Sequence, residues 1–167
     1  MPDHITTDRL ILRRPLMTDA DVIVPLIGDL EVARWLTRVP HPYGLDDAKG
    51  FLSAVIDKGA DVHLIEHDGH LVGCIGTVNE LGYWLGRQYW GQGIISEACT
   101  AVIAGYFADG HTDLDSGYFL GNAASRRVLE KQGFVPTSLC QKKSKATGET
   151  HTLQRMLLTR SAWEART

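Results

Sequence analysis

The segment that decides the fold reads Leu81-Gly82-Tyr83-Trp84-Leu85-Gly86-Arg87-Gln88-Tyr89-Trp90-Gly91-Gln92-Gly93-Ile94. It predicts a strand that enters a glycine-containing turn and opens directly into an apolar-periodic helix. Because Gly91 and Gly93 carry no Cβ atom, backbone N–H groups around them can converge on one anion. The N-terminus of the following helix adds unpaired N–H groups and the positive end of its dipole. The segment predicts a pyrophosphate site, although a Gly-x-Gly before a helix can also be only a turn.

Two common phosphate-binding motifs do not fit this turn. The Rossmann fingerprint needs a third glycine, and Ser96 occupies that position; the phosphate loop of nucleotide hydrolases needs a lysine that does not follow these glycines. What remains is Gln88-x-x-Gly91-x-Gly93. This pattern resembles the acetyl-coenzyme A signature, Arg/Gln-x-x-Gly-x-Gly/Ala, of the GCN5-related N-acetyltransferases (GNAT).

Three other segments carry the same resemblance, so that it spans nearly the whole chain. They are Asn122-Ala-Ala-Ser125 with Glu130-Lys-Gln-Gly133-Phe134, the opening Thr7-Asp8-Arg9-Leu10-Ile11-Leu12-Arg13, and the ending Met156 to Trp163. The opening and the ending are similar to the RimJ/RimL-like branch, which includes ribosomal-protein N-terminal acetyltransferases. Together the four segments are specific to a fold and a cofactor, and much less specific to an acceptor.

Length and composition predict one soluble domain spanning residues 1–167. The chain is 44% hydrophobic and 22% charged, as is ordinary for a globular protein, and its net charge of −3 gives no case for nucleic acid as a partner. No apolar run approaches the ~20 residues of a membrane span, and the first residues lack the pattern of a signal peptide. We therefore expect a cytoplasmic protein without a membrane partner, either a monomer or a homodimer.

Cysteine and histidine spacing predicts no metal site. Cys74, Cys99 and Cys140 are odd in number and far apart, which disfavours both a disulfide scaffold and a Cys-x-x-Cys site. His63 and His67 are four residues apart, but on a strand this spacing does not make two side chains converge.

Hydrophobic periodicity and turn residues predict an α+β protein with a three-layer α/β/α arrangement. Strands are expected over residues 9–14, 61–67, 70–78, 81–85, 114–118, 134–139 and 150–158. The strands at 61–67 and 70–78 are expected to form a hairpin around Asp68-Gly69, and the last two strands to form an antiparallel pair. Helices are expected over residues 18–27, 31–36, about 46–56, 94–108 and 123–132. Thr18 is expected to cap the first helix and Asp46 or Asp47 the third, and Gly133 is expected to end the last one in a left-handed conformation. The family resemblance implies the GNAT acyl-CoA N-acyltransferase fold, with a mixed, mostly antiparallel central sheet flanked by helices.

The resemblance also implies acetyl-CoA as cosubstrate and names the residues that hold it. The strand at residues 83–85 would splay from its neighbour and pair with pantetheine, while N–H groups of residues 89–94 would bind pyrophosphate. Ser96 either adds a hydroxyl or caps the helix, and Asn122 contacts the pantetheine arm, caps a helix, or does both. The implied cofactor residues are Tyr83, Trp84, Leu85, Gln88, Tyr89, Trp90, Gly91, Gln92, Gly93, Ile94, Ser96, Asn122 and Ser125.

The catalytic assignments depart from the usual family pattern. Many relatives carry a tyrosine as the acid where this chain has Leu129, and in the RimJ/RimL-like branch a serine has been proposed instead; Ser125 is the matching residue here. Ser125 is either that acid or a structural residue at a helix start. Glu80, at the entrance of the strand at residues 81–85, is either the general base acting through water or a solvated carboxylate.

Acceptor recognition is expected from the segment between residues 35 and 43, where two prolines punctuate the chain. Trp35, His41 and Tyr43 are large amphipathic groups on this loop, although Trp35 also suits core packing. The predicted activity is transfer of an acetyl group from acetyl-CoA to a primary amine, in the first place a protein N-terminal α-amino group. A small amine or amino acid is the alternative acceptor. A non-catalytic acyl-CoA-binding module is the alternative from another functional class.

Overall fold

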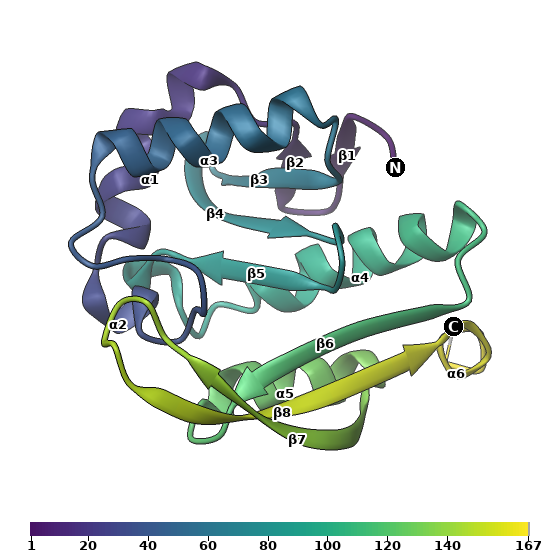
Figure 1. The fold of residues 1–167 in the computed structure, drawn as a ribbon. Helices are drawn as coiled ribbons and strands as arrows, with labels where there is room; N and C mark the ends of the chain where they lie inside the picture. The colour runs from purple at the N-terminus through teal and green to yellow at the C-terminus, as the bar shows by residue number, and fades with distance from the viewer. Residues whose placement is uncertain (167) are drawn as a thin grey trace.

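The computed structural model describes residues 1–166, which form two antiparallel sheets (Figure 1). The first has the strand order β1-β2-β3-β4-β5. Its strands are β1 His4–Thr6, β2 Leu10–Arg13, β3 Val62–His67, β4 His70–Gly76 and β5 Gly82–Leu85. The second has the order β6-β8-β7, with β6 Asp113–Phe119, β7 Val135–Lys143 and β8 Thr150–Thr159.

Helices cover both faces of the five-stranded sheet, which confirms the α+β, three-layer prediction. They are α1 Ala20–Ile27, α2 Leu30–Ala33, α3 Leu45–Asp57, α4 Ile94–Ala108, α5 Ala123–Gln132 and α6 Arg160–Glu164, with short 3-10 turns η1 Met17–Asp19 and η2 Arg87–Tyr89. One apolar cluster packs α1 and α3 against one face of the sheet, and a second joins α4 to the other face and to β6, β8 and α5. None of the helices in residues 1–166 has both the length and the apolar composition of a membrane span.

The alternation of buried and exposed residues along the strands determines which side chains of the first sheet enter the core. On β2, Leu10 and Leu12 are fully buried while Ile11 is exposed, as the period of two requires. The β3–β4 hairpin turns at Asp68 and Gly69, whose φ angles of 50° and 75° are those of a primed two-residue turn. The predicted hairpin is therefore confirmed, and the antiparallel pairing of β7 with β8 confirms the second one.

The structure differs from the prediction at two helix starts and contains two short elements that were not predicted. At the helix starts, aspartate side chains accept hydrogen bonds from backbone N–H groups and so shift the first helical residue. Strand β1 was not expected, since three polar-flanked residues carry no alternation signal. Regular helix α1 begins at Ala20 and not near Thr18, because Asp19 turns back to accept from the Leu16 N–H (2.7 Å). Helix α3 is capped by Gly44, not by Asp46 or Asp47; the Asp47 carboxylate accepts from the Gly44 N–H at 2.9 Å from inside the first turn. The C-terminal helix α6 was also not expected.

The two sheets meet at one point and then separate. The Leu81 N–H donates to the Asp115 carbonyl (2.7 Å), and the buried Ser116 hydroxyl donates to the Leu81 carbonyl (2.8 Å). Beyond these contacts no hydrogen bond joins β5 to β6 within residues 1–166. The two strands run in the same direction and diverge towards their carboxyl ends (Figure 1). One edge of β5 is consequently free of strand partners.

The Arg13–Asp19 pair anchors the start of α1 and predicts a pH-dependent stability. The Asp19 carboxylate accepts two hydrogen bonds from the Arg13 guanidinium, at 2.8 and 2.9 Å. Burial alone would raise the pKa of Asp19, but the bonds from Arg13 and Leu16 outweigh it and hold that pKa below its ordinary value. A lowered folded-state pKa contributes stability above the unfolded pKa, and this contribution is lost as the pH falls through the folded pKa.

We therefore expect Asp19→Asn to lower the free energy of unfolding by about 2 kcal/mol at pH 7, since hydrogen bonds to charged groups contribute about 1.5–3 kcal/mol. The difference between variant and parent should shrink below about pH 4, where the parent carboxylate itself takes up a proton. Urea unfolding at a series of pH values measures this. Asp21→Asn, at an exposed position on the same helix, serves as control. A loss that is constant down to pH 3 would contradict the assignment.

Candidate functional site

The turn between β5 and α4 presents a run of unpaired backbone donors. Gly91 and Gly93 have φ angles of 75° and 77°, and Gly93 is the N-cap of α4. Within residues 1–166, no protein group accepts a hydrogen bond from the N–H groups of residues 91–96. A Cβ atom added at Gly91 would meet no protein atom within 4 Å. Six free N–H groups at a helix N-terminus beside open space form a site suited to a phosphate or pyrophosphate.

The residues just before this turn have structural bonds of their own. Tyr89 and Trp90 donate their N–H groups to Gly86 and Arg87 within the η2 turn, so only the later part of the expected 89–94 set is free. The Trp90 indole donates to the Leu85 carbonyl (2.8 Å) and ties the turn to the end of β5. Gln88 accepts from the Gln92 side chain through its carbonyl (3.2 Å). Ser96 does not cap α4; its carbonyl accepts from Gln132 of α5 at 3.0 Å.

The structure brings Tyr83, Asn122 and Ser125 together across the opening between the sheets. The Tyr83 hydroxyl lies 2.9 Å from the Ser125 hydroxyl, and the Ser125 N–H donates to the Asn122 side chain at 3.1 Å. Burial raises the pKa of the Tyr83 phenol above its ordinary value. Asn122 is thus the N-cap of α5, as one of the alternatives predicted. Leu129 is fully buried in the apolar core and supplies no polar group here.

The side chains of β5 point alternately to the two faces of the sheet, and its backbone faces the opening. Trp84 packs with the apolar cluster of α1 and α3, whereas Tyr83 and Leu85 belong to the cluster of α4. The other edge of β5 is used by β4, with the partners Ile75↔Tyr83 and Gly73↔Leu85. The free edge at residues 83–85 therefore leads directly from the Leu81 contact to the glycine turn.

Glu80 lies in a charged network at the amino end of β5. Its carboxylate forms an ion pair with the guanidinium of Arg155 from β8, and Arg155 also lies 3.5 Å from the Asp115 carboxylate. The Glu80 side chain is 41% exposed, so one side of the carboxylate still faces solvent. No sequence pattern singles out Arg155 or Asp115, because each occupies an ordinary outward position of a strand and only the fold brings them to Glu80.

The 35–43 loop lies beside the turn that precedes α5. A Cβ atom at Gly121 would be 3.9 Å from the Trp35 ring, and the Lys145 N–H donates to the Thr37 carbonyl at 3.3 Å. His41 is exposed. Tyr43 packs partly against the cluster of α1 and α3, and burial, with the Asp47 charge second, raises its pKa to about 12. Of the three predicted acceptor residues, Trp35 lies near Gly121, His41 is exposed and Tyr43 is half-buried.

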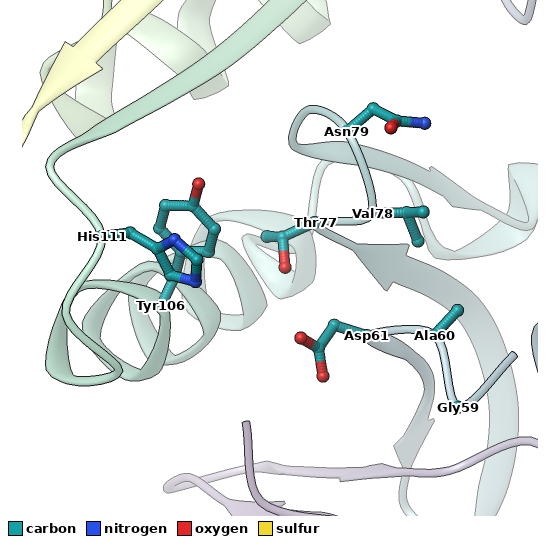
Figure 2. Close-up of a pocket in the computed structure, with 8 residues that line it drawn as sticks. All are labelled: Gly59, Ala60, Asp61, Thr77, Val78, Asn79, Tyr106 and His111. Atoms are coloured by element: carbon teal, nitrogen blue, oxygen red, sulfur yellow. The ribbon is translucent and has the colours of Figure 1, made fainter.

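A separate cavity of about 310 Å³ opens at the amino end of β5, away from the glycine turn. Figure 2 shows Asp61 and Thr77 on one side of it and the stacked rings of Tyr106 and His111 on the other. No residue from the predicted site lines this cavity. Among the described residues, no three His, Cys, Asp or Glu side chains converge as metal ligands would.

Comparison with known proteins gives a consistent match. Residues 9–135 match the family model described as an acetyltransferase (GNAT) domain. The chain is 27% identical to the putative ribosomal N-acetyltransferase YdaF of Bacillus subtilis (strain 168), over 97% of this chain and 94% of that protein.

Two solved structures illustrate the likeness of fold. The microcin C7 self-immunity acetyltransferase MccE, in complex with acetyl-CoA and AMP, has a TM-score of 0.81 at 18% identity and covers 95% of this chain and 97% of its own. RimL, the ribosomal L7/L12 α-N-protein acetyltransferase in complex with coenzyme A, also has a TM-score of 0.81 at 18% identity, covering 95% and 99%.

Proposed function

Because this chain belongs to the GNAT acetyltransferase family, we propose that it transfers the acetyl group of acetyl-CoA to the N-terminal α-amino group of a protein. The family model covers residues 9–135, and acetyl-CoA-dependent N-acetyl transfer is the activity of the family. The identity of the acceptor as a protein goes beyond what the family model gives. It is supported by the curated relative YdaF, whose name is that of a putative ribosomal N-acetyltransferase. A ribosomal protein N-terminus is accordingly the first acceptor to test.

The observation that carries the proposal is the free edge of β5 leading to unpaired N–H groups. Pantetheine carries amide groups, so it can pair with the backbone of residues 83–85 as another strand would. The N–H groups of residues 91–96, which have no protein acceptor among the described residues, then receive the pyrophosphate. Gln88, Tyr89 and Trp90 shape the turn, and Asn122 faces the same opening from α5.

Acetyl transfer requires a proton for the departing thiolate, and we assign it to Ser125. A phenol is a stronger acid than an aliphatic hydroxyl, so Tyr83 is the natural donor in the 2.9 Å bond to the Ser125 oxygen. With that lone pair occupied, the proton of Ser125 points away from Tyr83. Ser125 can then donate it to the sulfur as the carbon–sulfur bond breaks.

The amine must lose a proton, and we assign this step to Glu80 acting through water. Arg155 holds one side of the carboxylate in place, while the exposed side remains open to solvent. Glu80 and Asp115 also place two negative charges against the one charge of Arg155, which favours approach of a protonated amine.

Acceptor recognition is assigned to Trp35, His41 and Tyr43 on the loop beside the α5 turn. Rigid rings with polar tips gain contact area at low entropic cost, which suits a peptide terminus. We further propose a cytoplasmic setting, supported by the free thiols of Cys74, Cys99 and Cys140.

An acceptor panel tests the proposed function. Peptides with a free α-amino group, the same peptides blocked at that group but carrying a lysine, polyamines and free amino acids are each incubated with acetyl-CoA. We expect thiol release only with free α-amino peptides, with mass spectrometry placing the acetyl group on the first residue. Preferred acetylation of a small amine or of lysine would contradict the protein N-terminus. In the same panel, His41→Ala combined with Tyr43→Ala should raise the acceptor KM about tenfold (~1.4 kcal/mol) and leave the acetyl-CoA KM unchanged.

Replacing Gly91 with valine tests the cofactor turn. A β-branched residue at φ 75° is strained, and its side chain would occupy the open space before the free N–H groups. We expect the Kd for acetyl-CoA to rise at least about tenfold by calorimetry, corresponding to ~1.4 kcal/mol. Gly69→Val is the matched control, because Gly69 also has φ 75° and open space around it, at the tip of the β3–β4 hairpin. Equal effects of both variants on acetyl-CoA affinity would show a general loss of structure.

Replacing Glu80 with glutamine tests the base. We expect kcat to fall about 10²–10⁴-fold, with the acetyl-CoA KM unchanged and the rise of rate with pH removed. Asp115→Asn is the control, since it breaks the other carboxylate contact of Arg155 and leaves Glu80 in place. If both variants lose activity equally, the network acts through Arg155. If Glu80→Gln stays within threefold of the parent at every pH, the amine is deprotonated in bulk solvent.

A further inference from the structure

The N-terminal motif Thr7-Asp8-Arg9-Leu10 lies against the first turn of α4, through the carboxylate of Glu97. The Thr7 hydroxyl donates to one Glu97 oxygen at 2.6 Å. Arg9 donates to the same oxygen through its backbone N–H (3.0 Å) and to the other oxygen through Nε (2.8 Å). The Arg9 Nη2 is 2.7 Å from that second oxygen. Glu97 thus fixes both the backbone and the guanidinium of Arg9.

The remaining guanidinium nitrogen of Arg9 reaches the glycine turn. Nη1 donates to the Gln92 carbonyl at 3.1 Å. Gln92 lies between Gly91 and Gly93, which both have positive φ angles. Because glycine allows many backbone conformations, these neighbours do not by themselves fix the orientation of the peptide group between Gln92 and Gly93. In a planar trans peptide the C=O and the next N–H point in opposite directions. A bond that holds the Gln92 carbonyl toward Arg9 therefore turns the Gly93 N–H group away from Arg9, to the open side.

Arg9 also compensates a charge that would oppose an anion. The bonds from Thr7 and Arg9 outweigh partial burial and hold the pKa of Glu97 below its ordinary value, so this carboxylate is ionised at neutral pH. It lies in the first turn of α4, beside the N–H groups that receive the pyrophosphate in the proposed function. Removal of Arg9 would leave that negative charge unpaired close to a bound phosphate.

We propose that Arg9 is a positioning residue for the pyrophosphate: held by Glu97, it fixes the Gln92 carbonyl and so orients the Gly93 N–H group toward the ligand. This inference rests on the proposed role of the glycine turn and adds to it a residue more than eighty positions away in sequence. It also gives a reason for the Thr-x-Arg-Leu opening, which the acetyl transfer itself does not use.

The test compares acetyl-CoA with S-acetyl-pantetheine, which carries the thioester but no pyrophosphate. For Arg9→Gln we expect the acetyl-CoA KM to rise about tenfold, while kcat/KM for S-acetyl-pantetheine and the KM of the acceptor stay within about twofold. Arg9→Lys keeps the charge, but an ammonium cannot match the guanidinium fork that spans Glu97 and Gln92. It should therefore retain most of the defect.

Arg14→Gln is the matched control. Arg14, at the other end of β2, also joins a carboxylate to a carbonyl, with Asp61 at 2.9 Å and Ala60 at 2.7 Å. It should lower thermal stability without changing the ratio of the two thioester substrates. Full recovery in Arg9→Lys, or an equal loss with both thioesters, would overturn the inference. If Gly91→Val raises the acetyl-CoA Kd while Arg9→Gln leaves the KM unchanged, the inference fails and the cofactor turn stands. If neither variant changes acetyl-CoA binding, the turn itself is wrongly assigned.

Discussion

The hydrogen bond from the Leu81 N–H to the Asp115 carbonyl is the constraint on which the site depends. It joins β5 to β6 at their amino ends, and the Ser116 hydroxyl secures it from the buried side. Parallel strands that continued this pairing would consume the edge of β5 along its whole length. Because they part after one contact, the chain keeps a strand edge unpaired within its own structure. Edges of this kind are usually covered, and in the proposed function pantetheine would cover this one.

At the glycine turn, as along β5, backbone groups are left without a partner in the protein, here at the start of a helix. Residues 91–96 leave six N–H groups without a protein acceptor among the described residues, and these groups all lie near the start of α4. Bonds on either side keep the turn in this form: the Trp90 indole holds it to Leu85, and Arg9 holds it to the first turn of α4. Side chains thus hold these backbone N–H groups without a protein acceptor, as the proposed binding of an anion requires.

The architecture was largely predictable from sequence, whereas the network around Glu80 was not. Alternation on β2, the Asp68-Gly69 turn and the left-handed Gly133 after α5 are local signals, and each was read correctly. Helix starts were wrong where a side chain made an unexpected bond, as Asp19 does with Leu16.

Among the polar side chains of the site, pairs close in sequence were predictable and pairs distant in sequence were not. Asn122 and Ser125 are three residues apart and could be placed together from a motif. Tyr83 with Ser125, and Arg155 with Glu80, are joined only by tertiary structure, and no periodicity in the sequence reports such a pair.

The separation of the two sheets has a thermodynamic consequence for the whole molecule. Beyond Leu81, the two sheets are connected across the opening in two ways. The Tyr83–Ser125 hydrogen bond joins β5 to α5, and α4 packs against α5 in the apolar core. In the proposed function, acetyl-CoA seated in the opening would pair with the free edge of β5 and so become part of the folded structure. Its binding adds RT ln(1 + [L]/Kd) to the free energy of unfolding, about 2.7 kcal/mol at a hundredfold excess over Kd. A variant that weakens acetyl-CoA binding at this edge should therefore also reduce the stabilisation that acetyl-CoA gives to the folded protein.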